Sequence, residues 1–80
     1  MWYCLVRYSF DAIKPVFGPF NTKEEAWGAA LANAQKEFDI DQNENEYDSD
    51  MSEYEEYGEI ILVNHFTDRD DTTEYLIFEL

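Results

Sequence analysis

The sequence predicts an α+β fold in which one helix packs on one face of an antiparallel sheet of three to four strands, in the order β-β-α-β-β. Segments rich in aromatic and β-branched residues, which strands prefer, stand at both ends of the chain. One segment with the apolar spacing of an amphipathic helix lies between them. Because 80 residues are enough for one small core, we expect residues 1–80 to form a single domain.

The first two strands are predicted at residues 2–10 and at Val16 and Phe17. In the first segment, WYCLVRYSF, apolar residues alternate with a mixed set, so one face is expected in the core. That face comprises Trp2, Cys4, Val6, Tyr8 and Phe10. The second segment is interrupted by Gly18 and Pro19, and the proline restricts it to a short edge strand.

The helix is predicted over residues 21–38. Thr22 followed by Glu25 forms a capping box, which satisfies backbone N–H groups at the start of a helix. Farther along, four residues recur at spacings of four, three and four, so they share one face. These residues are Trp27, Leu31, Ala34 and Phe38. We expect this face to pack on the sheet.

Two further strands are predicted at residues 59–66 and 72–80, joined by a polar turn at residues 67–71. Since one helix covers only one face of a sheet, the other face is expected to expose a mixed patch, which is a candidate dimer or partner surface. The residues considered for this patch are Tyr3, Leu5, Tyr75 and Ile77, or their neighbours on the opposite face.

Acidic residues are concentrated in the second half of the chain. The formal net charge is −14, from 19 Asp and Glu against 5 Lys and Arg. Residues 1–36 carry a net charge of +1, and residues 37–80 a net charge of −15. Direct binding to nucleic acid or to an anionic membrane requires a basic face, so both are disfavoured. A basic partner protein is favoured instead.

Residues 39–57 form an acidic segment, expected to be a loop or an edge segment of the domain. Residues 39–50 are predicted to be an extended loop, and the pattern leaves open whether residues 51–57 form a strand. Alternate residues of an extended chain lie about 6.6 Å apart on one face. One such row comprises Glu44, Glu46, Asp48 and Asp50. It would place one carboxylate for about every two phosphates of a DNA strand, whose spacing is about 3.4 Å.

The sequence contains no motif for catalysis, a metal or a cofactor, and we expect a binding protein rather than an enzyme. EF-hand frames that begin at Asp39 or Asp48 place glutamate where the loop needs glycine. One cysteine and one histidine are too few for a zinc site. We expect Cys4 in the core, and His65 beside a turn rich in aspartate where carboxylates would bind it.

The expected location is the cytoplasm. A single cysteine cannot form an internal disulfide, which fits a reducing compartment. The first ten residues lack the charged and apolar regions of a signal peptide, and no apolar run approaches the ~20 residues that span a bilayer.

The predicted partner-binding surface combines carboxylates with tyrosines, which supply amphipathic anchors at interfaces. Its residues are Glu44, Glu46, Tyr47, Asp48, Asp50, Glu53, Tyr54, Glu55, Glu56, Tyr57, Glu59, Asp68, Asp70 and Asp71. Such a surface would occupy a basic groove built for nucleic acid, so we predict an acidic nucleic-acid mimic that inhibits a nuclease or another nucleic-acid-binding protein. The alternative is a generic small protein-interaction or homodimerising domain, whose acidic residues only keep it solvated.

The whole chain resembles small acidic proteins encoded by bacterial phages and mobile elements. The stretches that carry the resemblance are WYCLVRYSFDA, GPFNTKEEAW, and NHFTDRDD together with TTEYLIFEL. That genetic setting includes anti-CRISPR and antirestriction inhibitors, some of which look like nucleic acid. The resemblance therefore implies an inhibitor of host defence nucleases. It implies no particular functional residue, because these inhibitors share no common motif.

Overall fold

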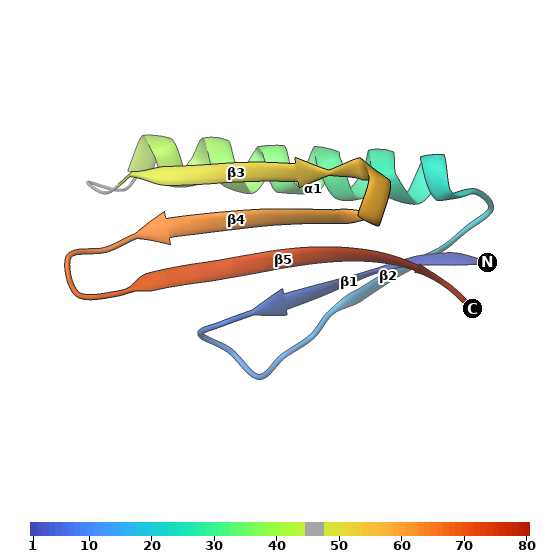
Figure 1. The fold of residues 1–80 in the computed structure, drawn as a ribbon, viewed down its shortest axis with the longest axis horizontal. Coiled ribbons are helices and arrows are strands. Elements are labelled where there is room, and N and C mark those ends of the chain that lie inside the picture. Colours follow the sequence, from blue (N-terminus) through green and yellow to red (C-terminus); the bar gives the residue numbers. More distant parts are fainter. Residues whose placement is uncertain (45–47) are drawn as a thin grey trace.

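The computed structural model describes residues 1–44 and 48–80 and shows one sheet with one helix. The elements in chain order are β1 (Trp2–Tyr8), β2 (Val16–Phe20), α1 (Lys23–Glu44), β3 (Ser49–Tyr54), the 3-10 turn η1 (Glu55–Tyr57), β4 (Glu59–His65) and β5 (Asp70–Glu79). All neighbouring strands are antiparallel, in the spatial order β2-β1-β5-β4-β3, and α1 runs along the long axis of the sheet (Figure 1).

The predicted α+β class and the single helix are confirmed, but the sheet has five strands and the order is β-β-α-β-β-β. The additional strand, β3, lies inside the acidic segment. Its backbone pairs with β4 from Ser49 opposite Asn64 to Tyr54 opposite Glu59. Only Ser49 and Met51 reach the core side, where Ser49 is buried and Met51 packs against buried residues. Backbone pairing therefore holds a strand that has little apolar patterning.

The helix begins where the capping box predicts. The N–H of Glu25 donates to Thr22 Oγ1 at 3.1 Å, and the N–H of Asn21 donates to the Glu25 carboxylate at 3.1 Å. The helix then continues through Glu44, so the predicted end at residue 38 and the predicted extended loop over residues 39–44 are wrong. The sequence has no glycine or proline here, and the Asp41 carboxylate, bound by Asn64 of β4, attaches the last turns to the sheet.

The core lies between α1 and the helix-facing side of the sheet. Small residues four apart on α1, Ala26, Ala30 and Ala34, are buried and let the helix approach closely. The predicted residues Trp27, Leu31 and Phe38 pack beside this line and stay partly exposed. The sheet contributes Cys4, Val6, Ile60, Leu62 and Tyr75. Phe10 is not in the core as predicted, because β1 ends at Tyr8 and Phe10 is 57% exposed.

The sheet face away from the helix carries a different set of side chains. The register between β1 and β5 pairs Tyr3 with Phe78 and Leu5 with Leu76. Tyr75 and Ile77 face the helix, so the expected patch combining them with Tyr3 and Leu5 is wrong. The open face instead joins alternate residues of β1, β5 and β4, among them Tyr3, Leu5, Leu76, Phe78, Ile61 and Val63.

Candidate functional site

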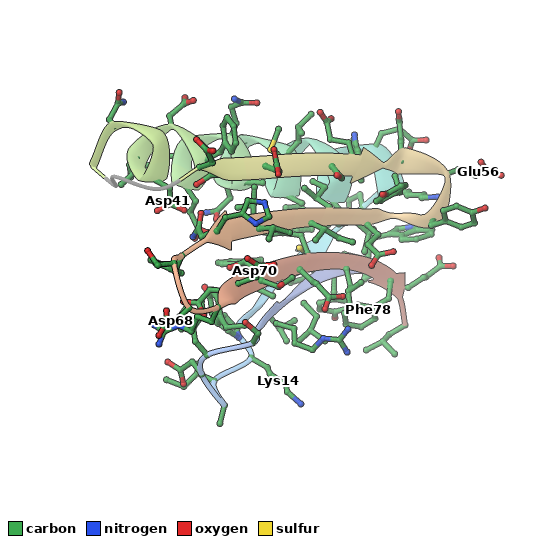
Figure 2. All side chains as sticks on the ribbon, turned by 60° about the vertical axis from the view of Figure 1, so that its left-hand side comes forward. Lys14, Asp41, Glu56, Asp68, Asp70 and Phe78 are labelled. Atoms are coloured by element: carbon green, nitrogen blue, oxygen red, sulfur yellow. The ribbon has the colours of Figure 1, made fainter. Side chains whose placement is uncertain are left out.

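The predicted site residues that the structure describes are mostly carboxylates along one edge of the sheet, which we call the acidic margin. It comprises Asp48, Asp50, Glu53, Glu55, Glu56, Glu59, Asp68, Asp70 and Asp71. It follows the edge strand β3 from the β4–β5 turn to η1, at opposite ends of the long axis (Figure 1). Asp68 and Asp70 lie towards one end and Glu56 at the other (Figure 2). All nine are exposed except Glu59 and Asp71, which are half-buried.

The turn end of the margin is bridged by a histidine on the open face. His65 Nε2 lies 2.7 Å from Asp50 Oδ2 on β3, and His65 Nδ1 lies 3.0 Å from Asp70 Oδ1 on β5. The hydrogen bonds to Asp50 and then Asp70 raise the pKa of His65 above its ordinary value, and both carboxylate charges act in the same direction. A protonated His65 therefore links three neighbouring strands at this end of the sheet.

A second cation, Arg69, lies in the β4–β5 turn. Its Nε donates to Asp71 Oδ1 at 3.2 Å, and its guanidinium lies 5.3 Å from the centroid of the Phe66 ring. Arg69 is therefore directed to its own turn, where its pairing with Asp71 contributes little to stability because the guanidinium is exposed to solvent. Its charge offsets part of the negative charge at this end of the margin.

At the η1 end of the margin, no described Lys, Arg or His pairs with the carboxylates. Within the described part of the chain, Glu53, Glu55, Glu56 and Glu59 form no ion pair. Two large side chains stand among them, and both are exposed: Tyr54 by 45% and Tyr57 by 74%. An exposed tyrosine beside unpaired carboxylates supplies both the apolar contact area and the charge that a basic partner surface requires.

A hydrogen-bond chain fixes the margin to the rest of the fold. Ser49 Oγ donates to Asn64 Oδ1 at 2.6 Å, and Asn64 Nδ2 donates to Asp41 Oδ2 at 3.0 Å. The N–H of His65 also donates to the carbonyl of Asp48 at 2.9 Å. The start of β3, the end of β4 and the C-terminal turns of α1 therefore hold one another in place. The carboxylates of β3 stand on a paired strand rather than on a free loop.

The predicted extended row of alternating carboxylates is not formed. Glu44 is the last residue of α1, while Asp50 belongs to β3 and is separated from Asp48 by the start of that strand. Glu46 and Tyr47 lie outside the described residues. The carboxylates from Asp48 onwards are instead arranged along β3, η1 and the adjoining turn. The alternating acids of the sequence predicted one straight row of carboxylates. In the structure, the carboxylates of the margin are instead distributed over several paired elements.

The structure separates the single cysteine of the sequence from the single histidine. Cys4 is buried on the helix-facing side of β1, where burial raises the pKa of its thiol to about 11. His65 is on the open face of β4, bound to carboxylates. Residues 39–44 are helical and residues 49–54 form a strand, so neither EF-hand frame adopts a loop there. Among residues 1–44 and 48–80, no group of His, Cys, Asp or Glu is arranged to hold a metal ion.

The open face offers a second candidate surface. The rings of Tyr3 and Phe78 stack with centroids 5.7 Å apart, and Leu5 and Leu76 lie next to them by register. Arg7 pairs with Glu74 at 2.8 Å on the adjoining row. This face is therefore apolar at Tyr3, Leu5, Leu76 and Phe78 and polar around His65. Both chain termini lie at one end of the sheet (Figure 1).

One interaction was not expected from the sequence. The contact of Asp41 with Asn64 depends on the helix continuing past residue 38, and the regular spacing of Glu37, Ile40 and Asp41 was the available signal.

None of the helical segments in the described residues is long and apolar enough to cross a bilayer. Comparisons with protein-family models, with curated proteins and with solved structures found no match to this chain.

Proposed function

We propose that this protein is an acidic nucleic-acid mimic, which inhibits a nuclease or another nucleic-acid-binding protein by occupying its basic groove. The observation that supports this most is the acidic margin, which runs from Asp48 through β3, η1, β4 and the β4–β5 turn to Asp71 of β5. Its nine carboxylates stand against only Arg69 and His65 in that part of the chain. In this proposal the protein acts by binding and not as an enzyme, and it works in the cytoplasm.

The margin carries somewhat fewer charges per unit length than one strand of nucleic acid, since residues 48–56 hold five carboxylates. Residues 48 to 56 span at most about 26 Å at ~3.3 Å per residue. One strand of duplex DNA carries about eight phosphates over that length, at ~3.4 Å each. The whole molecule is 40 Å long and carries a formal net charge of −14, or about one net charge per 3 Å. A basic groove shaped for a phosphate backbone would therefore meet a comparable density of negative charge.

A second feature that supports the proposal is preorganisation. The margin is built on a strand that is paired with β4 and tied through Asn64 to α1. Fixed carboxylates lose less conformational freedom on binding than those of a disordered acidic tail. Tyr54 and Tyr57 add apolar contact area beside the carboxylates, which favours a defined site over diffuse attraction.

The resemblance to small acidic proteins of phages and mobile elements agrees with this proposal, and an anti-CRISPR-like or antirestriction role is its most specific form. The partner is then a basic nucleic-acid-binding protein. The chain itself would not bind nucleic acid, because like charges repel.

Capture from a bacterial lysate tests the proposal. The immobilised protein is exposed to lysate at low salt, and the retained proteins are eluted first with duplex DNA and then with high salt. We expect the retained proteins to be basic nucleic-acid-binding proteins that duplex DNA displaces, because protein and DNA compete for one groove. Retained proteins that high salt releases but duplex DNA does not would refute the mimic proposal.

A second candidate function is a protein-interaction or homodimerising domain that uses the open face. The stacked pair Tyr3 and Phe78, beside Leu5 and Leu76, favours it, because an apolar cluster outside the core is typical of interaction surfaces. Sedimentation at several concentrations distinguishes this role. A dimer that Leu5→Lys dissociates, and that Glu56→Lys leaves intact, would assign the interface to the open face.

A further inference from the structure

A groove of about 490 Å³ lies beside the C-terminal half of α1, and none of its lining residues belongs to the acidic margin. Its floor is the helix-facing side of the sheet, at Tyr8 of β1, Thr73 of β5 and Asn64 of β4. One wall is α1, and the other is the connection between β1 and β2. Its volume is within the range of sites that take a small molecule or a few side chains.

The two walls present apolar side chains to solvent. Phe10 and Ile13 of the β1–β2 connection are 57% and 63% exposed, and Ile40 of α1 is 44% exposed. The Phe10 ring lies beside Tyr8, with centroids 5.2 Å apart, so the floor and one wall share an aromatic surface. Three large exposed apolar residues around one hollow are more than isolated surface hydrophobes and indicate a contact site.

The same groove is acidic. Asp11, Glu37 and Asp41 line it, and none of the lining residues that the structure describes is Lys, Arg or His. Asp41 already accepts a hydrogen bond from Asn64, and Asp11 accepts one from the N–H of Ile13 at 3.0 Å. Glu37 is half-buried and interacts with the Tyr75 hydroxyl, whose pKa it helps to raise, but it forms no ion pair with any residue that the structure describes. The nearby Lys14 projects from its loop away from the sheet (Figure 2).

Two carboxylates of the groove influence the hydroxyl of Tyr8 on its floor. The pKa of Tyr8 is raised, first by burial of its hydroxyl and then by the charges of Glu37 and Asp11. Both carboxylates are thus close enough to influence one hydroxyl in the groove. The site combines negative charge, an aromatic ring pair and apolar walls, without an internal cation to satisfy it.

We propose that this groove binds an arginine side chain together with a neighbouring apolar residue, presented by a segment of a partner protein. A planar guanidinium donates to carboxylates in a fork and also stacks on aromatic rings, so Glu37, Asp41 and the Tyr8–Phe10 pair match both properties. The apolar neighbour covers Ile13 and Ile40. A lysine fits less well, because its ammonium is a strongly hydrated point charge. This inference does not depend on the partner being a nucleic-acid-binding protein.

Peptide binding followed by NMR tests the proposal. The probe is acetyl-Leu-Arg-Phe-amide, and the matched control replaces arginine with citrulline, which has a similar shape but no charge. We expect the arginine peptide to shift backbone amides at residues 8–15 and 37–41, and to bind roughly tenfold more tightly than the citrulline peptide. Equal affinity for the two peptides, or shifts confined to the acidic margin, would overturn the proposal.

Two variants of equal charge locate the site. Glu37→Gln removes a groove carboxylate, whereas Glu53→Gln removes an exposed margin carboxylate outside the groove. We expect Glu37→Gln to weaken binding of the arginine peptide roughly tenfold, and Glu53→Gln to change it less than twofold. The exposed substitution Ile13→Ser, which does not affect the core, should also weaken binding. Equal losses from Glu37→Gln and Glu53→Gln would contradict the proposal.

The same spectra distinguish another occupant of the groove. If amides at residues 8–15 and 37–41 shift with protein concentration when no peptide is present, the groove binds a second copy of the chain, and the proposal is wrong. Glu37→Gln leaves the acidic margin unchanged. If the peptide experiments contradict the groove proposal, the proposal that the margin binds a basic partner therefore still stands.

Discussion

His65 on β4 and Asp50 on the edge strand β3 are joined at 2.7 Å, with Asp70 of β5 at the other ring nitrogen. The pKa of His65 in the folded protein is therefore raised above the unfolded value of about 6.5. A raised folded pKa means that the stabilising contribution is fully present below about pH 6.5 and is lost as the pH rises through the folded pKa. Because His65 is exposed at the sheet surface, solvent screens this contribution.

We predict that His65 titrates above pH 6.5, and that Asp50→Asn lowers its pKa more than Asp70→Asn, because the hydrogen bond to Asp50 is the larger cause of the shift. NMR titration of the His65 ring protons measures the pKa of His65 in the native protein and in both variants. The denaturation midpoint of the native protein should also approach that of His65→Gln as the pH is raised from 6 to 9. A His65 pKa at or below 6.5 would contradict this account.

A pair of glycine substitutions should change stability in opposite directions. Gly58 follows η1 with φ +64°, and an added Cβ would lie 3.1 Å from Ile77 Cβ and 3.3 Å from its carbonyl oxygen. Gly58→Ala should therefore destabilise the fold by about 1–3 kcal/mol. Gly28 lies in α1 with nothing within 4 Å of an added Cβ, so Gly28→Ala should stabilise by about 0.5–1 kcal/mol. Urea unfolding measures the change in the free energy of unfolding for both variants. Changes of the same sign would contradict the surroundings described for Gly58 and Gly28.

The close approach of α1 to the sheet gives a third prediction. Ala34 is fully buried against the sheet, whereas Ala32 on the same helix is exposed. Ala34→Leu should destabilise by about 1–3 kcal/mol, because the added methylenes force the helix away from its contacts. Ala32→Leu is the control and should change the free energy of unfolding by less than about 0.5 kcal/mol. Similar changes for both variants would mean that the helix does not lie on the sheet through its alanines.

A fourth prediction concerns the buried hydroxyl of Tyr75. It donates to Asn33 Oδ1 at 2.9 Å, and its ring is fully buried in the core. Tyr75→Phe keeps the ring and removes the hydroxyl's hydrogen bond to Asn33 and its interaction with Glu37, while Asn33 is exposed and takes up water. We expect a loss of about 0.5–1.5 kcal/mol by chemical denaturation. A loss above about 3 kcal/mol would mean that the hydroxyl has a larger structural role than these two interactions.

The parts of the fold that were predicted from sequence share a strong local signal. The strand at residues 2–8 has alternating apolar residues, and the start of α1 has Thr22 and Glu25 at capping-box spacing. The strands at residues 59–65 and 70–79 are rich in β-branched and aromatic residues. In each case a few neighbouring residues determine the local structure.

The parts that were missed depend on distant contacts. β3 has one apolar residue on its core side, Met51, and forms because β4 offers a free edge to pair with. The last turns of α1 contain Asp39, Asp41 and Glu44 and persist where Asn64, more than twenty residues away, binds Asp41. The same contacts bring Glu37 and Asp41 to the β1–β2 connection. The number of acidic residues was evident from the sequence. Their distribution over β3, η1, β4 and β5, rather than along one extended segment, was not.

The affinity of matched charge variants for a captured basic partner tests the central claim most directly. One variant combines Glu53→Gln, Glu55→Gln and Glu56→Gln, which are exposed margin residues without ion pairs in the described structure. The control combines Glu24→Gln, Asp39→Asn and Glu79→Gln, which lie off the margin and change the net charge equally. We predict that Kd rises roughly tenfold or more for the margin variant and no more than about threefold for the control. An equal rise for both would show that only net charge matters and would contradict the mimic proposal.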